Sequence, residues 1–170
     1  MSKEQMVSAP PPRRISGVAV IRDSEGSVLL VRNRYAATMR LPGARAENGE
    51  SADLACTRGV LADVGIKVPC DTLMTVDYAP AAHAVPESHC FVFNGGTLEY
   101  RAPSILINGD LGHFEWSPPK DLSKYIPLAY ERRVRRALDQ CEGGGILYLW
   151  QGGIPDVDRP KVPAFSSMHA

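Results

Sequence analysis

The sequence predicts a single α/β domain, and two observations support this. Short runs rich in β-branched residues flank two segments with helical periodicity. The chain has 170 residues, of which 44% are apolar and 22% charged, the ordinary range for one domain with its own core. No internal repeat divides the sequence.

The strands begin with a predicted hairpin. Residues 15–22 and 28–32 are two β-branched runs, and Asp23-Ser24-Glu25-Gly26 between them is a typical turn sequence. Three later runs, 73–78, 89–93 and 112–116, also predict strands.

The first helix is predicted over residues 51–64. Ser51 is a suitable N-cap, Asp53 lies near the positive end of the helix dipole, and Gly65 stands where helices commonly end. Its expected buried stripe is Leu54, Leu61 and Val64. The second helix, residues 129–140, is amphipathic, and its arginines are expected on the solvated face: Arg132, Arg133, Arg135 and Arg136.

The two ends of the chain differ from its centre. Residues 1–13, with three consecutive prolines, predict a disordered tail, because proline lacks the amide donor and fixes φ. The domain is expected over residues 14–141. Residues 142–170 begin with three glycines and hold one strand candidate, 146–150, so we expect a partly ordered extension or a segment that lies on a partner subunit.

Charge and apolar patterning exclude several classes of partner. Nineteen basic and nineteen acidic residues leave no net field for a nucleic-acid polymer or an anionic membrane. No apolar run of about 18 residues and no secretory signal is present, which predicts a cytoplasmic protein. The four cysteines have neither zinc-site nor disulfide-framework spacing and are expected to be buried free thiols.

One stretch carries a motif. Glu50, Arg58, Val60, Gly65 and Ile66 have the spacing of the pattern G-x5-E-x7-R-E-U-x-E-E-x-G-U, where U is apolar, and the loop before it contains Leu41-Pro42-Gly43, Glu47 and Gly49. This stretch resembles the signature of Nudix (MutT-like) hydrolases. Outside it, Asp77-Tyr78-x-Pro80, Phe91-Val92-Phe93 and Arg132-Arg133-Val134 are similar to a group of actinobacterial MutT-like proteins. The resemblance covers roughly residues 14–150 and implies the Nudix fold, a mixed β-sheet sandwiched between helices.

The stretch departs from the family pattern where metal would bind. The family has Glu at three positions on one helix face, and this chain has Gly59, Ala62 and Asp63 there, with Ala44 in place of the second loop glycine. Carboxylates at those positions hold divalent cations that neutralise a diphosphate. The chain therefore has a degenerate Nudix box.

The resemblance implies a set of site residues. Gly43, Glu47 and Asp63 would hold Mg²⁺ or Mn²⁺ if the protein is hydrolytic, and no cofactor is needed otherwise. Glu50 and Asp63 are the catalytic candidates of the box, although Glu50 and Arg58 are expected to brace loop against helix. Phosphate and base recognition is expected from residues near the loop and a later strand: Arg32, Arg40, Arg45 and Tyr78.

A catalyst without metal would need another acid or base. His113 and Glu115 alternate along one strand and point to one face, where a hydrogen-bonded His and carboxylate could act as a general base. The simpler reading is that both are exposed strand residues.

Three functions remain open. The first is a Nudix-type hydrolase of a nucleoside diphosphate linked to a small group, of reduced or altered activity; fold analogy favours it. The second is a non-hydrolytic domain that binds a nucleotide or phosphorylated metabolite. The third is a metal-independent catalyst in specialised metabolism. A homodimer is expected in each case.

Overall fold

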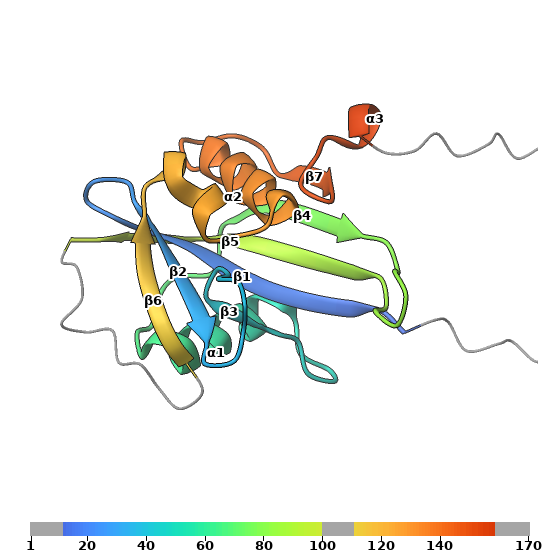
Figure 1. Cartoon of the computed structure of the whole chain (residues 1–170), viewed down its shortest axis with the longest axis horizontal. Coiled ribbons are helices and arrows are strands. Elements are labelled where there is room, and N and C mark those ends of the chain that lie inside the picture. The colour runs from blue at the N-terminus through green and yellow to red at the C-terminus, as the bar shows by residue number, and fades with distance from the viewer. Residues whose placement is uncertain (1–11, 100–110, 159–170) are drawn as a thin grey trace, which may run out of the picture.

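The computed structural model describes residues 12–99 and 111–158. Within these residues, seven strands form one mixed sheet in the order β6-β2-β1-β5-β4-β7, and β3 pairs with β1 beside this path. The strands are β1 Arg14–Asp23, β2 Val28–Asn33, β3 Gly43–Arg45, β4 Leu73–Ala79, β5 Ser88–Leu98, β6 Leu111–Ser117 and β7 Leu147–Trp150. The long strands β1 and β5 run parallel at the centre (Figure 1).

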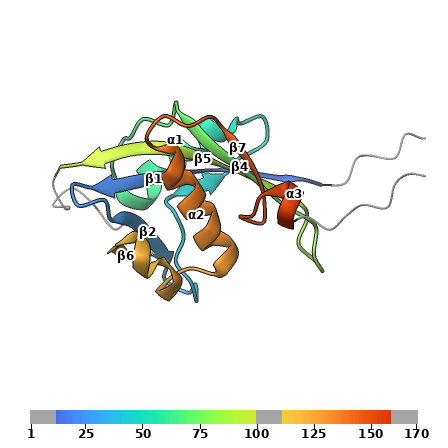
Figure 2. The same ribbon diagram turned by 90° about the horizontal axis from the view of Figure 1, so that it is seen from above.

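Helices cover both faces of the sheet. They are α1 Ala52–Val64, the 3₁₀ helix η1 Pro119–Lys124, α2 Leu128–Gln140 and the short α3 Pro155–Asp158. Figures 1 and 2 show α1 on one side of the central strands and α2 on the other. The predicted α/β architecture, a mixed sheet between helices, is confirmed.

Alternation along β1 produces the two cores. Ala19 and Ile21 pack with Cys56, Val60 and Val64 of α1. Val20, one residue out of step, packs on the opposite face with residues of α2, namely Val134 and Ala137. Successive strand side chains point to opposite faces, so one apolar strand supplies both cores.

Most predicted elements lie within one or two residues of their observed bounds, but some were missed. The strand predicted over 89–93 extends from Ser88 to Leu98 as β5. The 3-residue strand β3, the 3₁₀ helix η1 and α3 were not predicted. β3 exists because its backbone pairs with β1, with Ala44 opposite Gly17, which is a non-local contact without a local sequence pattern.

The predicted buried stripe of α1 is wrong in two of its three members. Leu54 is 58% and Leu61 49% exposed, whereas Val64 is buried. The face that meets the sheet consists mostly of small residues: Ala55, Cys56, Gly59, Val60 and Val64. Small side chains allow α1 to approach the sheet closely, so residue size misled the prediction.

The predicted exposure of the α2 arginines is also wrong for one residue. Arg133 has a side chain only 13% exposed, and its Nε lies 2.6 Å from Asp77 Oδ2 on β4. The buried carboxylate of Asp77, 56 residues earlier, draws the guanidinium beneath the helix. Arg132 and Arg136 are exposed, as predicted.

The four cysteines are free, as predicted; Cys56, Cys70 and Cys90 are buried, and Cys141 is half-buried.

The segment after α2 belongs in part to the sheet. In residues 142–158, β7 pairs parallel with β4. Most of the predicted tail, residues 1–11, and the last twelve residues lie outside the described residues. No described helix combines the length and apolarity needed to cross a membrane.

Candidate functional site

A cavity of about 600 Å³ opens where the loop that carries the start of the motif meets α1 and the start of β1. This volume is within the usual range for small-molecule sites. The lining comes from β1, the end of β2, the loop before β3, β3 itself, α1, β5 and α2. Segments far apart in sequence therefore meet around one cavity.

The floor of this pocket is one face of the parallel pair β1 and β5. Arg14, Ser16 and Val18 alternate along β1, and Ser88 and Cys90 lie opposite them on β5. The period of two in a strand places these side chains on the same face. The α2 side contributes Ile126, Tyr130, Arg133 and Val134.

Glu50 and Arg58 join the loop to α1. Both carboxylate oxygens of Glu50 accept hydrogen bonds of 2.8 Å from Arg58, and one accepts another from the backbone N–H of Glu47. The hydrogen bond from Arg58 lowers the pKa of Glu50 from 4.5 to about 2. Arg58 also donates to the carbonyl of Arg45, so it fixes the loop at two points. The expected bracing contact is present.

Asp63 lies in the pocket lining and is held by Arg40. Its Oδ2 accepts hydrogen bonds from Arg40 Nη1 at 2.7 Å and from the backbone N–H of Gly43 at 3.0 Å, and its Oδ1 accepts one from Arg40 Nη2 at 2.9 Å. The carboxylate is only 13% exposed. Asp63 thus forms a bidentate ion pair with Arg40.

Gly59 is a point of backbone contact. A Cβ at this position would lie 2.2 Å from the carbonyl carbon of Gly43 and 2.3 Å from the amide nitrogen of Ala44. Because both neighbours are backbone atoms, any side chain at residue 59 would displace the loop. The close approach of the loop backbone therefore explains a glycine at this position.

Known proteins share this fold. No family model matches the chain. A MutT-like protein of Streptomyces ambofaciens is 27% identical over 143 residues, which cover 82% of this chain and 86% of that protein. Among solved structures, a MutT protein from Methanosarcina mazei Go1 has a TM-score of 0.64 at 22% identity, covering 81% of this chain and 100% of the other. A NUDIX hydrolase from Nitrosomonas europaea has a TM-score of 0.60 at 20% identity, covering 76% and 90%. The chain has the Nudix fold.

The resident metal of Nudix hydrolases does not fit the residues of this Nudix-fold protein. The carbonyl oxygen of Gly43 and the carboxylate of Asp63, two of the expected ligands, are within hydrogen-bonding distance of Arg40. Glu47 is 73% exposed and lies 3.6 Å from Arg58. No cluster of three or more His, Cys, Asp or Glu side chains suited to a metal occurs in residues 12–99 and 111–158. Mg²⁺ needs near-octahedral oxygen coordination. The oxygens of Gly43 and Asp63 do not supply it, because they already face the guanidinium of Arg40.

The residues expected to bind substrate separate into two groups. Arg40 and Arg45 line the pocket. Arg32, an exposed residue of β2, and Tyr78 of β4 are not among its lining residues. Tyr78 instead donates a hydrogen bond of 2.8 Å to Glu87 and packs against Trp150, with ring centroids 5.0 Å apart.

The expected alternative acid–base pair lies elsewhere on this Nudix fold. His113 Nε2 and Glu115 Oε2 are 3.5 Å apart on β6, with side chains 52% and 36% exposed. They share one face, as their alternation predicts. Neither lines the pocket.

Sequence reasoning missed several lining residues, above all Arg14. Its side chain has no acidic partner among the described residues, and the same is true of Arg45. Strand alternation of Arg14, Ser16 and Val18 could have indicated a shared face. The pairing of β1 with β5, which completes the floor, left no local pattern.

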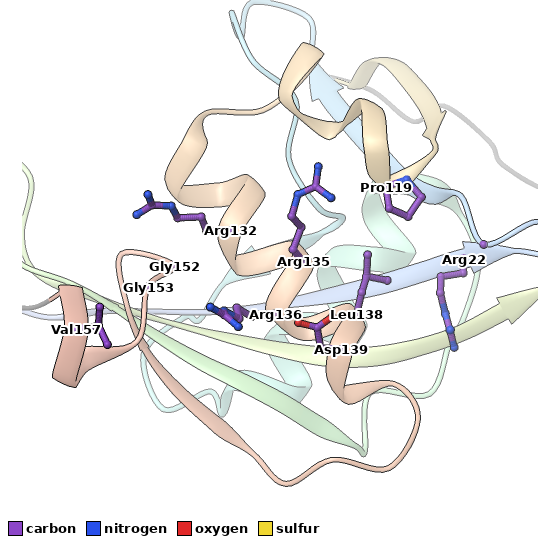
Figure 3. Close-up of a pocket in the computed structure, with 11 residues that line it drawn as sticks. Arg22, Pro119, Arg132, Arg135, Arg136, Leu138, Asp139, Gly152, Gly153 and Val157 are labelled. Carbon is purple, nitrogen blue, oxygen red and sulfur yellow. The ribbon is translucent and has the colours of Figure 1, made fainter.

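A second cavity, of about 760 Å³, lies on the outer side of α2. Its arginines are Arg22, Arg132, Arg135 and Arg136. Figure 3 shows the Arg132 and Arg135 side chains pointing away from one another, and Arg135 is paired with Glu131 at 2.8 Å. These cations do not converge on one ligand position, so the pocket beside the Nudix loop is the better candidate.

Proposed function

We propose that this chain binds a phosphorylated small molecule, of the nucleoside diphosphate class, in the pocket beside the loop. The observation that carries this proposal is the charge of the lining. Five arginines and one aspartate line the pocket. Arg40, Arg58 and Arg133 are paired with Asp63, Glu50 and Asp77. Arg14 and Arg45 remain as two cations without an acidic partner among the described residues.

Two unpaired guanidinium groups suit a diphosphate. Arginine presents its N–H donors in a planar fork that matches phosphate oxygens. The whole chain carries no net charge, so this local excess, and not a general basic field, would select an anion. Ser16, Ser88 and Tyr130 add hydroxyl groups to the lining that can donate to phosphate or sugar oxygens.

Hydrolysis of such a compound is the second candidate function. It is supported by the similarity of this chain to the MutT-like protein and by the fold that it shares with a NUDIX hydrolase. Asp63 is paired with Arg40 and Glu50 with Arg58, so neither carboxylate is available to hold a metal, which supports reduced activity. Mg²⁺ or Mn²⁺ would accompany this candidate function. Homodimer formation, a cytoplasmic location and the metal-independent catalyst using His113 stay predictions.

The test of binding is calorimetric titration of the full chain with ADP in EDTA. A charge-assisted hydrogen bond contributes about 1.5–3 kcal/mol, so Arg14→Ala and Arg45→Ala are each expected to weaken binding at least about tenfold. Arg136→Ala is the matched control, because this exposed arginine lines only the outer cavity. Equal loss in all three variants, or no binding of ADP by the wild type, would contradict the proposal.

The test of hydrolysis is phosphate or monophosphate release from a panel of nucleoside diphosphate compounds, with Mg²⁺ or Mn²⁺ titrated over a wide range. Binding without turnover supports the first function. Metal-dependent turnover that is lost in Asp63→Ala supports the second, and turnover that persists in EDTA but is lost in His113→Ala supports a metal-independent catalyst.

A further inference from the structure

The guanidinium of Arg40 lies in a cage of oxygen atoms. Nη1 is within hydrogen-bonding distance of the carbonyl oxygens of Leu41, at 3.1 Å, and Gly43, at 3.2 Å, and of Asp63 Oδ2 at 2.7 Å. Nη2 donates to Asp63 Oδ1 at 2.9 Å and to the side-chain oxygen of Asn33 at 3.1 Å. Five oxygens thus face one cation.

This oxygen set has the chemistry of a divalent-cation site. Backbone carbonyls, a carboxylate and a side-chain amide are the hard donors that Mg²⁺ and Ca²⁺ take in proteins. Two members, Gly43 and Asp63, are residues that the family resemblance assigns to metal. The side chain of Arg40 is therefore placed where the positive charge of a metal would be.

The charge of the cage fits one arginine better than a divalent ion. Asp63 supplies a single negative charge, which the single positive charge of Arg40 balances. A second carboxylate cannot come from residue 59, because the loop backbone fills that space, and residue 62 is alanine. The other nearby acid, Glu50, is held by Arg58.

We propose that Arg40 is a built-in replacement for the divalent cation, so that the pocket receives its anionic ligand without metal. The part about the ligand rests on the proposed binding function; the part about the metal does not. Arg40 is 36% exposed, so it forms part of the surface that the ligand meets while its two terminal nitrogens stay bound to the cage.

The metal part is tested with Mn²⁺ alone, by electron paramagnetic resonance of the free ion in titrations of the full chain. The wild type and Asp63→Asn are expected to bind Mn²⁺ equally, because Asp63 holds no Mn²⁺ in the wild type. Arg40→Met is expected to bind Mn²⁺ at least tenfold more tightly than the wild type, and Arg40→Met combined with Asp63→Asn is expected to lose that gain. Arg45→Met is the matched control, since Arg45 lines the same pocket but the hydrogen bonds of the Asp63 carboxylate come from Arg40 and Gly43.

A wild-type Mn²⁺ site in the micromolar range that disappears in Asp63→Asn would overturn the proposal, and this arm does not depend on how an Arg40 variant folds. The proposal would also be overturned if Arg40→Met or Arg40→Gln folds, as checked by circular dichroism, and yet gains no affinity for Mn²⁺. The ligand part is tested by ADP titration in EDTA. Absence of ADP binding in any condition would refute the proposed function and leave the Mn²⁺ result standing; binding only with metal would overturn the metal-free pocket.

Discussion

At the scale of single residues, the position of the pocket loop depends on the absence of a side chain at Gly59. A glycine within a helix costs about 1 kcal/mol relative to alanine, and Gly59 is buried in the middle of α1. Its absent side chain lets the loop at Gly43 and Ala44 lie directly on the helix. That contact carries the Gly43 amide to within 3.0 Å of Asp63, so one small residue determines how the loop and the acid are joined.

Gly59→Ala is predicted to destabilise the protein although alanine favours helix. Overpacking against immovable backbone costs about 3 kcal/mol, which exceeds the helix gain, so the free energy of unfolding should fall by about 2 kcal/mol in urea titration. Leu61→Ala, on an exposed position of the same helix, is the control and should change it by less than about 1 kcal/mol. A neutral or stabilised Gly59→Ala variant would show that the loop does not rest on α1.

At the scale of elements, a buried ion pair fastens the C-terminal part of the fold. Asp77 of β4 is fully buried and accepts hydrogen bonds from Arg133 of α2 and, at 2.9 Å, from the backbone N–H of Gly152 after β7. One carboxylate therefore links β4, the covering helix α2 and the turn that follows the edge strand β7. A charged residue in this position is stable only while its partner remains.

Asp77→Asn is predicted to lower the free energy of unfolding by about 3–5 kcal/mol, because Arg133 would remain buried without its counterion. Glu131→Gln is the matched control on α2, the helix that carries Arg133. It removes the half-exposed pair with Arg135 and should cost at most about 0.5 kcal/mol. Chemical unfolding measures both, and similar losses in the two variants would contradict the central role of Asp77.

At the scale of the whole molecule, stability should depend on acid pH. The pKa values of Glu50, Glu87 and Asp121 are lowered in the folded state by hydrogen bonds from Arg58, from Tyr78 and Arg13, and from Lys124. A carboxyl group with a lowered folded pKa binds fewer protons folded than unfolded. Its stabilisation is complete above the unfolded pKa and is lost as the pH falls through the folded value.

The melting temperature is therefore predicted to stay level near neutral pH and to fall as the pH drops below about 4.5, with the contribution of Glu50 lost between 4.5 and about 2. Glu50→Gln should have a lower melting temperature at pH 7 and a shallower decline in acid. Differential scanning calorimetry across this range is the measurement. An acid decline in Glu50→Gln as steep as in the wild type would show that Glu50 does not contribute.

The sequence by itself determined the α/β class, the positions of most strands and of the two long helices, and the loop that carries the motif. These follow from local rules: period two in strands, caps and periodicity in helices, and the fixed spacing of Glu50 and Arg58. The family resemblance placed Gly43 and Asp63 at one site, and the sequence placed Arg40 and Arg45 beside the same loop.

Only the tertiary structure decided which charges are free. The pairing of Arg133 with Asp77 spans 56 residues, and that of Arg40 with Asp63 spans 23. The floor that exposes Arg14 needs β1 to lie beside β5, and the burial of small residues on α1 needs the sheet beneath it. Contacts between distant segments leave no periodic trace in a single sequence, and they determine whether an arginine faces a ligand or an acid.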